Sequence, residues 1–156
     1  MEKRCISQEC LNDTGFSYTL SLINGKYKMT ILYTLMEFKI VRFNEIAPNI
    51  LEADAVVFTM PVYWYSIPAQ VKGVIDRLFS FCVAGKDLAG KECALITCCE
   101  EDDMSVMDGV RIPVERSAAL LKWKMVGEVL VPGVLNVGDI EKTDGCNQAA
   151  ALADKF

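Results

Sequence analysis

The stretch that most constrains the fold runs from Ala53 to Phe79, with the sequence ADAVVFTMPVYWYSIPAQVKGVIDRLF. It begins with an apolar run, Ala55 to Met60, which is too short for a globular helix and is bounded by Pro61. A short and continuously apolar run of this kind is typical of a strand that is buried on both faces. We therefore predict a strand from Ala55 to Met60 that ends at Pro61.

A helix is predicted a few residues after this strand. Ser66 can cap it, and Pro68 falls in its first turn, where a missing N–H is harmless. Apolar residues then recur at the spacing of a helix that lies on a sheet. These residues are Val71, Val74, Ile75, Leu78 and Phe79. Strand, loop and helix form half of a βαβ unit, so the sequence indicates an α/β fold with a parallel sheet.

Three aromatic residues, Tyr63, Trp64 and Tyr65, lie in the loop between this strand and this helix. Ligands of open α/β sheets bind at such loops, beyond the carboxyl ends of the strands. Three flat rings beside a strand end favour a planar ligand. The alternative interpretation is that the rings only cover the end of the strand.

The segment EADAVVFTMPVYWYSIPAQVKGVIDRLF resembles the central part of the flavodoxin-like NAD(P)H-dependent FMN reductases and their iron-sulfur flavoprotein relatives. In that family, a strand ending in a T/S-P-x-Y-W pattern precedes an S-x-P-A-x-x-K-x-x-I-D-R helix. The resemblance extends from about Ile46 to Phe156. It implies a flavodoxin-like, three-layer parallel sheet and an FMN ring that lies against the loop from Pro61 to Tyr65.

The resemblance also implies an activity, in which electrons pass from NAD(P)H through FMN to a quinone or another small acceptor. The cofactor carries this chemistry, so no catalytic side chain is expected. The residues expected to bind FMN come from two loops, and they are Pro61, Val62, Tyr63, Trp64 and Tyr65 after one strand and Thr97, Cys98 and Cys99 after the next.

The next strand is predicted from Lys91 to Cys99, and the acidic run Glu100 to Asp103 follows it. Carboxylates beside an anionic cofactor would repel it. Alternatively, these acids supply negative charge at the N-terminus of a helix. That helix is predicted to be interrupted at Pro113 and to end at Gly127.

The end of the chain is predicted as a strand and a helix. The strand runs from Glu128 to Leu135, and Pro132 places it at or near an edge of the sheet. The helix runs from Gln148 to Phe156 and should pack its alanines and Leu152 on the sheet. The alternation of strands and helices favours right-handed crossovers between parallel strands.

The N-terminal part contains no phosphate loop. A flavodoxin-like domain should open with a strand and a polar, glycine-rich turn that holds the FMN phosphate. No such turn occurs between Tyr18 and Glu45. The apolar spacing there predicts two short helices broken near Gly25, and a strand from Met29 to Leu35 is the competing prediction.

The segment YTLSLINGKYKMTILYTLMEFKIVRFNEIAPNI, Tyr18 to Ile50, resembles the N-terminal part of HxlR-type winged-helix regulators. In that family the next helix reads the major groove of DNA. This helix is missing here, so sequence-specific DNA binding is not expected. The basic residues Lys26, Lys28, Lys39 and Arg42 could still touch phosphates.

The two resemblances predict a junction. We expect a helical segment over residues 1–45, resembling a partial helix-turn-helix, and a flavodoxin-like domain over 46–156 that lacks its first strands. The exposed parallel edge at Ala55 to Met60 must then be covered by the N-terminal segment or by a second subunit, so we expect a homo-oligomer. The alternative function is a regulatory DNA- or protein-binding module with a degenerate flavodoxin-like half.

Composition narrows these choices. A net charge of −5 argues against bulk electrostatic attraction to nucleic acid or to an anionic membrane. We expect a cytoplasmic protein, because no signal peptide and no apolar run of membrane-spanning length is seen. Seven cysteines and no histidine favour reduced thiols, and without a C-x-x-C pair no metal site is expected.

Overall fold

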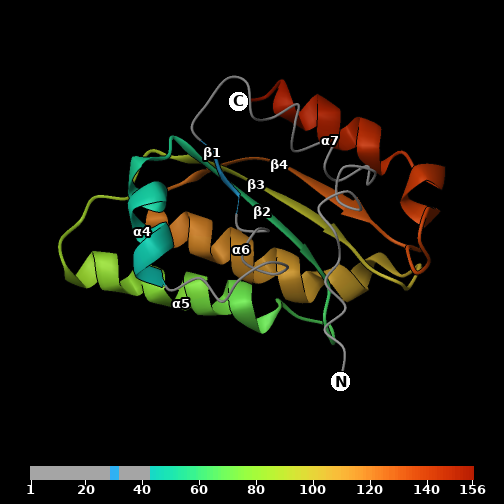
Figure 1. Ribbon diagram of the computed structural model, residues 1–156, viewed down its shortest axis with the longest axis horizontal. Helices are drawn as coiled ribbons and strands as arrows, with labels where there is room; N and C mark the ends of the chain where they lie inside the picture. Colours follow the sequence, from blue (N-terminus) through green and yellow to red (C-terminus); the bar gives the residue numbers. More distant parts are fainter. Residues whose placement is uncertain (1–28, 32–42) are drawn as a thin grey trace, which may run out of the picture.

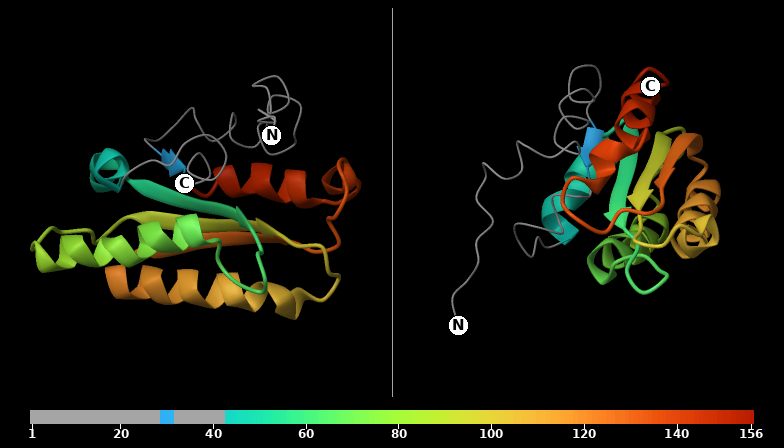
Figure 2. Two further views of the ribbon diagram at one scale, coloured as in Figure 1. Left: turned by 60° about the horizontal axis from the view of Figure 1, so that its bottom comes forward. Right: turned by 90° about the vertical axis from the view of Figure 1, so that its right-hand side faces the viewer.

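The computed structural model describes residues 29–31 and 43–156. These residues form a four-stranded sheet in the order β1-β2-β3-β4, in which every neighbouring pair is parallel. Helices α5 and α6 lie on one face of this sheet and α7 lies on the other (Figure 1, Figure 2). The three-layer α/β architecture predicted from the sequence is therefore confirmed.

The elements have the following bounds. The strands are β1 Met29–Ile31, β2 Ala55–Pro61, β3 Glu92–Cys98 and β4 Lys124–Val131. The α-helices are α4 Phe43–Glu52, α5 Ala69–Val83, α6 Asp108–Leu121 and α7 Gly145–Ala153. The short 3₁₀ helices are η1 Met104–Met107 and η2 Asp139–Lys142. No described helix is long and apolar enough to cross a membrane.

Strand β2 is buried on both faces, as its apolar run predicted. Phe58 points into the larger core, which α4, α5 and α6 cover, and Val57 points into the smaller core beneath α7. The strand extends one residue beyond the predicted Met60. Pro61 is the last residue of β2 and pairs with Cys98 of β3. Strand β2 thus presents alternate side chains to two cores.

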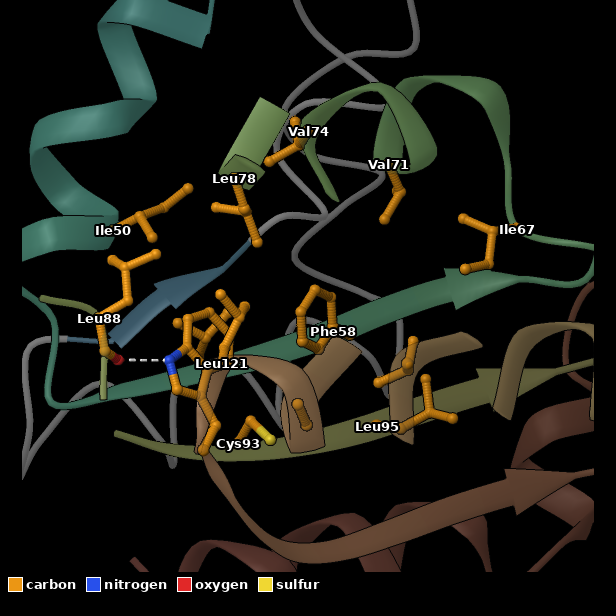
Figure 3. Close-up of a cluster of buried hydrophobic side chains, with 14 of the residues drawn as sticks. Ile50, Phe58, Ile67, Val71, Val74, Leu78, Leu88, Cys93, Leu95 and Leu121 are labelled. Atoms are coloured by element: carbon orange, nitrogen blue, oxygen red, sulfur yellow. Dashed lines mark hydrogen bonds between the residues drawn. The ribbon is translucent and has the colours of Figure 1, made fainter. Parts of the chain in front are cut away.

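The larger core lies between the sheet and the helices α5 and α6 (Figure 3). Its central rings are Phe58 and Trp123, which stack with centroids 6.3 Å apart. The indole N–H of Trp123 donates to the carbonyl oxygen of Leu88 at 2.6 Å. Labelled members around them are Ile50, Ile67, Val71, Val74, Leu78, Leu95 and Leu121.

The N-terminal prediction of helices is wrong at residues 29–31. Met29–Ile31 forms strand β1, which pairs in parallel with residues 55–57 of β2. The open edge of β2 offers unpaired backbone groups, and this pairing outweighs the helical spacing of the apolar residues. The competing prediction of a strand was correct here. The rest of the predicted helices, the break near Gly25 and the basic residues from Lys26 to Arg42 lie outside the described residues.

Helix α4 continues from Phe43 to Glu52 and includes Pro48. It thus runs across residues 45 and 46, where the two predicted segments meet, and the division into two domains stays a prediction. Lys91 ties the end of α4 to the sheet, because its ammonium group donates to the carbonyl oxygens of Leu51 at 3.0 Å and Ala53 at 2.6 Å. These carbonyls have no partner within the helix ladder.

Three local predictions around the helices are wrong. Ser66 does not cap α5, because the helix begins at Ala69 and its N-cap residue is Pro68, which therefore lies just before the first turn and not in it. Pro113 does not interrupt α6, since it lies near the N-terminal end, where the helix forgoes a single backbone hydrogen bond. The helix ends at Leu121, well before Gly127, and Lys122 takes the left-handed conformation that closes it.

Strand β4 also begins earlier than predicted, at Lys124, and includes Gly127. A Cβ atom at Gly127 would lie 2.6 Å from Cδ1 of Leu152, so this glycine lets α7 pack closely on the strand. The strand ends at Val131, before Pro132 and earlier than predicted. It is the last strand of the sheet formed by the described residues, so the edge position is confirmed. The terminal helix starts at Gly145 and buries Ala149 and Leu152 against the sheet, as expected.

Candidate functional site

The two loops predicted to form a site lie side by side, because β2 and β3 are parallel neighbours. Pro61 pairs with Cys98 in the register of the sheet. The N–H of Val62 then donates to the carbonyl oxygen of Cys98 at 3.1 Å. The aromatic loop after β2 therefore starts at the end of β3, at the carboxyl edge of the sheet, where open α/β folds bind ligands.

The aromatic loop is a tight turn with an unusual backbone. Tyr63 and Ser66 exchange two backbone hydrogen bonds, each 3.0 Å long. Between them, Trp64 has φ 49° and Tyr65 has φ 62°. Positive φ at both central residues is the pattern of a type I′ turn, which normally requires Asn or Gly. For bulky residues this conformation costs about 1–2 kcal/mol each.

The turn exposes its rings to solvent. Trp64 is 93% exposed, and Tyr63 and Tyr65 are 57% and 56% exposed. Strained residues that persist in a fold cluster at binding sites, where the surrounding structure holds them. The alternative interpretation, in which the rings only cover the end of β2, does not agree with this exposure. The turn presents all three rings to solvent instead.

Two contacts hold the turn in place. The phenol of Tyr65 donates to Oε1 of Glu101 at 2.9 Å. On its other side, the turn lies against the first turn of α6, where a Cβ atom at Gly109 would overlap the carbonyl oxygen of Tyr65. The hydrogen bond to Glu101, and the carboxylate charge behind it, raise the pKa of Tyr65.

The β3 side of the site differs from its prediction in exposure. The side chains of Thr97 and Cys99 are buried, at 2% and 6% exposure, and Cys98 is half-buried. Cys98 packs toward the core beneath α7. Thr97 and Cys99 are thus shielded from solvent, while the turn from Tyr63 to Tyr65 carries the exposed surface. The assignment of all eight residues to FMN stays a prediction.

The two thiols at the end of β3 are not activated. Burial raises the pKa of both Cys98 and Cys99. The thiol of Cys99 also donates to the carbonyl oxygen of Glu101 at 3.2 Å. Because the thiolate is the reactive form, both residues are weak nucleophiles at neutral pH.

The acidic run after β3 has structural roles in the fold. Asp103 caps η1, since its carboxylate accepts from the N–H of Ser105 at 2.8 Å, and this hydrogen bonding lowers the pKa of Asp103. Glu101 accepts from Tyr65. The alternative interpretation, that these acids serve a helix N-terminus, is confirmed for Asp103. Among the described residues, no group of acids and cysteines could hold a metal ion.

Sequence reasoning missed two residues that shape the site. In the sequence, Glu101 stands among acidic neighbours, and nothing singles out Gly109. The parallel order of β2 and β3 could have indicated that the loops after them meet. A glycine in the first turn of a helix could have indicated a close approach of another backbone.

The sequence model of the family described as flavodoxin-like fold matches residues 23–154 of this chain. The chain belongs to this family. The match covers every described strand and helix and the aromatic turn. Of the described residues, only 155 and 156 lie outside it.

Short segments of the chain are similar to curated proteins. An uncharacterized HTH-type transcriptional regulator of Halalkalibacterium halodurans is 52% identical over 40 residues, which is 26% of this chain and 35% of that protein. Ribosyldihydronicotinamide dehydrogenase [quinone] of Rattus norvegicus is 48% identical over 41 residues, which is 24% of this chain and 18% of that enzyme. The chain thus spans about a third and a fifth of these relatives' lengths.

Solved structures share the fold. The Trp repressor binding protein from Bacillus subtilis has a TM-score of 0.61 and 18% identity, with 70% of each chain covered. Azoreductase from Bacillus anthracis str. Sterne has a TM-score of 0.59 and 24% identity, covering 73% of this chain and 62% of that one. At these identities the similarity shows the flavodoxin-like fold alone.

Proposed function

We propose that the chain is a cytoplasmic, FMN-dependent NAD(P)H oxidoreductase that passes electrons to a quinone or another small acceptor. The observation that carries this proposal is the aromatic turn from Tyr63 to Ser66. It presents exposed rings on a strained backbone at the carboxyl end of β2, in a chain of the flavodoxin-like family. A flat, apolar ligand with hydrogen-bonding edges matches such a surface.

The backbone of the turn supports the proposal of a flavin ring. Among the described residues, the N–H groups of Trp64 and Tyr65 have no backbone acceptor, while those of Tyr63 and Ser66 are paired within the turn. Two adjacent N–H donors would bind the carbonyl and ring-nitrogen acceptors along one edge of a flavin. The exposed rings would pack against its apolar part and keep water away.

Bound FMN would supply the two-electron chemistry with NAD(P)H. The residues of this chain would bind and orient the ring, and none of them needs to move a proton. The phenol of Tyr65 is held as a donor by Glu101 and stays neutral. Both thiols at the end of β3 are kept protonated by burial and take no part as nucleophiles.

Relatives support the proposed class of reaction. The enzyme of Rattus norvegicus that is similar to a 41-residue segment is named ribosyldihydronicotinamide dehydrogenase [quinone]. An uncharacterized NAD(P)H oxidoreductase of Escherichia coli is 40% identical over 37 residues. These names and the family resemblance support NAD(P)H as the electron donor and a quinone as the acceptor.

The acidic residues after β3 would repel the phosphate of FMN. We therefore expect the flavin ring, and not the phosphate, to bind at the aromatic turn. An anion site must come from another part of the chain. The basic residues considered for it, Lys26, Lys28 and Arg42, lie outside the described residues.

The test is a visible absorption titration of the purified full chain with FMN. We expect a flavin band that shifts on binding and bleaches when NADH or NADPH is added. Trp64→Ala should weaken FMN binding about tenfold or more, because it removes the most exposed ring of the turn. The absence of saturable binding at roughly tens of micromolar FMN would contradict the proposal.

A regulatory role in binding DNA or protein is the second candidate. It is favoured by the 52% identity over 40 residues to an HTH-type transcriptional regulator. Binding of a DNA duplex by a chain that takes up no FMN, measured as a change in fluorescence anisotropy, would support this role. Such binding would fall steeply with added salt if it rests on phosphate contacts.

We also propose that the chain forms a homo-oligomer. Strand β1 pairs with residues 55–57 of β2, and among the described residues nothing pairs with residues 58–61 on that side. A partly open edge of this kind invites association. Sedimentation equilibrium should give a multiple of the 17.3 kDa chain mass. A single-chain mass at every concentration up to about 100 µM would contradict this proposal.

A further inference from the structure

We propose that Glu101 is a positioning residue, whose carboxylate holds the phenol of Tyr65 and thereby fixes the Trp64–Tyr65 turn against the loop after β3. This inference rests on the proposed function in one respect, since the surface that Glu101 holds in place is the one proposed to bind the flavin ring. The hydrogen bond itself joins residues 36 positions apart, on the loops that follow β2 and β3.

Glu101 is anchored well enough to act in this way. Its carbonyl oxygen accepts from the N–H of Gly133 at 3.1 Å and from the thiol of Cys99 at 3.2 Å. Gly133 follows β4, so the peptide of Glu101 is tied to the loop after that strand as well. The side chain of Glu101 thus reaches Tyr65 from a backbone that the ends of β3 and β4 hold.

The turn needs an external tie. Trp64 and Tyr65 both have positive φ without being Gly or Asn, and such a conformation persists only when surrounding contacts enforce it. Within the turn, the two backbone hydrogen bonds between Tyr63 and Ser66 close the chain. The phenol–carboxylate hydrogen bond fixes where the closed turn lies relative to β3.

The other acids of the run do not have this role. Asp103 accepts from the N–H of Ser105 and caps η1. Asp102 lies beside Gly133, since a Cβ atom built on Gly133 would be 2.7 Å from Oδ1 of Asp102. Glu100 is exposed and carries the same charge as Glu101 one residue earlier in the chain. Glu100 therefore provides a control for the effect of charge alone.

The test compares Tyr65→Phe, Glu101→Ala and Glu101→Gln with the control Glu100→Ala. The first readout is amide hydrogen exchange of Tyr63 and Ser66, which needs no ligand. We expect Tyr65→Phe and Glu101→Ala to speed this exchange about three- to tenfold, as suits the loss of one exposed, charge-assisted hydrogen bond. Glu101→Gln keeps an acceptor and should retain most of the protection.

The second readout is the ultraviolet titration of the tyrosine phenols. Glu101→Ala should lower the pKa of Tyr65 toward its ordinary value, because the hydrogen bond and the neighbouring negative charge both raise it. Glu100→Ala should leave both the exchange and this titration unchanged. The double variant Tyr65→Phe/Glu101→Ala should match either single variant in amide exchange, since both remove the same contact.

The third readout is the dissociation constant of FMN, which should rise about three- to tenfold in Tyr65→Phe and Glu101→Ala. Unchanged amide exchange in both variants would overturn the positioning role. If the wild-type chain binds no FMN but the exchange of Glu101→Ala still rises, the proposed function fails while the positioning role stands. The two hypotheses are thus judged separately.

Discussion

Replacing Gly109 by alanine is expected to displace the aromatic turn and to weaken FMN binding by at least tenfold. A Cβ atom at this position would overlap the carbonyl oxygen of Tyr65 and lie 2.9 Å from its carbonyl carbon. Both are backbone atoms, which cannot swing aside as the end of a long side chain can. Because α6 is packed into the core and the turn is exposed, we expect the turn to move.

The helix itself should tolerate this change, since alanine has a higher helix propensity than glycine by about 1 kcal/mol. Loss of FMN binding without loss of helix content would therefore locate the effect at the turn. The measurements are the FMN dissociation constant and the far-ultraviolet circular dichroism of the variant. Wild-type FMN affinity in Gly109→Ala would show that the turn does not form the ring-binding surface.

Gly73→Ala is the matched control. Gly73 also lies in a helix, α5, but a Cβ atom there would meet nothing within 4 Å. The same substitution should stabilise the protein by up to about 1 kcal/mol and leave FMN binding unchanged. The contrast between the two glycines separates a steric effect on the site from a general effect of alanine in a helix.

These glycines also show where sequence reasoning stops. The apolar runs of β2 and β3 were predicted to within one or two residues, because a strand buried on both faces must be continuously apolar. Gly127 was taken as the end of a helix, but it lies in β4 beneath Leu152 of α7. The reason for a glycine can lie in a distant part of the chain that its local sequence does not reveal.

Strand β1 illustrates the same limit. Met29–Ile31 has neighbours at helical spacing and residues that favour strands, so local preference left both open. The open edge of β2 decides between them, because it offers backbone partners. The secondary structure of this segment is decided by its pairing with β2, so the sequence of the segment alone could not predict it.

The candidate site was predicted in place but not in detail. The order strand, aromatic loop, helix located it at the carboxyl end of β2, where Trp64 is now seen exposed. The left-handed turn was not foreseen, because Trp and Tyr are poor residues for positive φ. The partner of Tyr65 was not foreseen either, since Glu101 is brought to it by the register of two strands.

Trp123→Ala is expected to destabilise the protein by about 3–5 kcal/mol, which is typical of a large aromatic residue removed from a core. Trp123 is 6% exposed, stacks on Phe58 and donates its indole N–H to the carbonyl oxygen of Leu88. Such a loss is a large part of the total stability, since the free energy of unfolding of a native domain is about 5–15 kcal/mol. Urea denaturation followed by circular dichroism gives the free energy of unfolding.

Trp123→Phe separates the ring from its hydrogen bond. It keeps an aromatic ring against Phe58 but leaves the buried carbonyl of Leu88 without its donor, which should cost about 1–3 kcal/mol. Trp123 precedes β4 at the amino edge of the sheet, roughly 20 Å along the strands from the aromatic turn. The folded variant should therefore bind FMN as the wild type does, in contrast to Gly109→Ala. Wild-type stability in Trp123→Phe would mean that this hydrogen bond contributes nothing to the fold, and weakened FMN binding would mean that the two edges of the sheet are coupled.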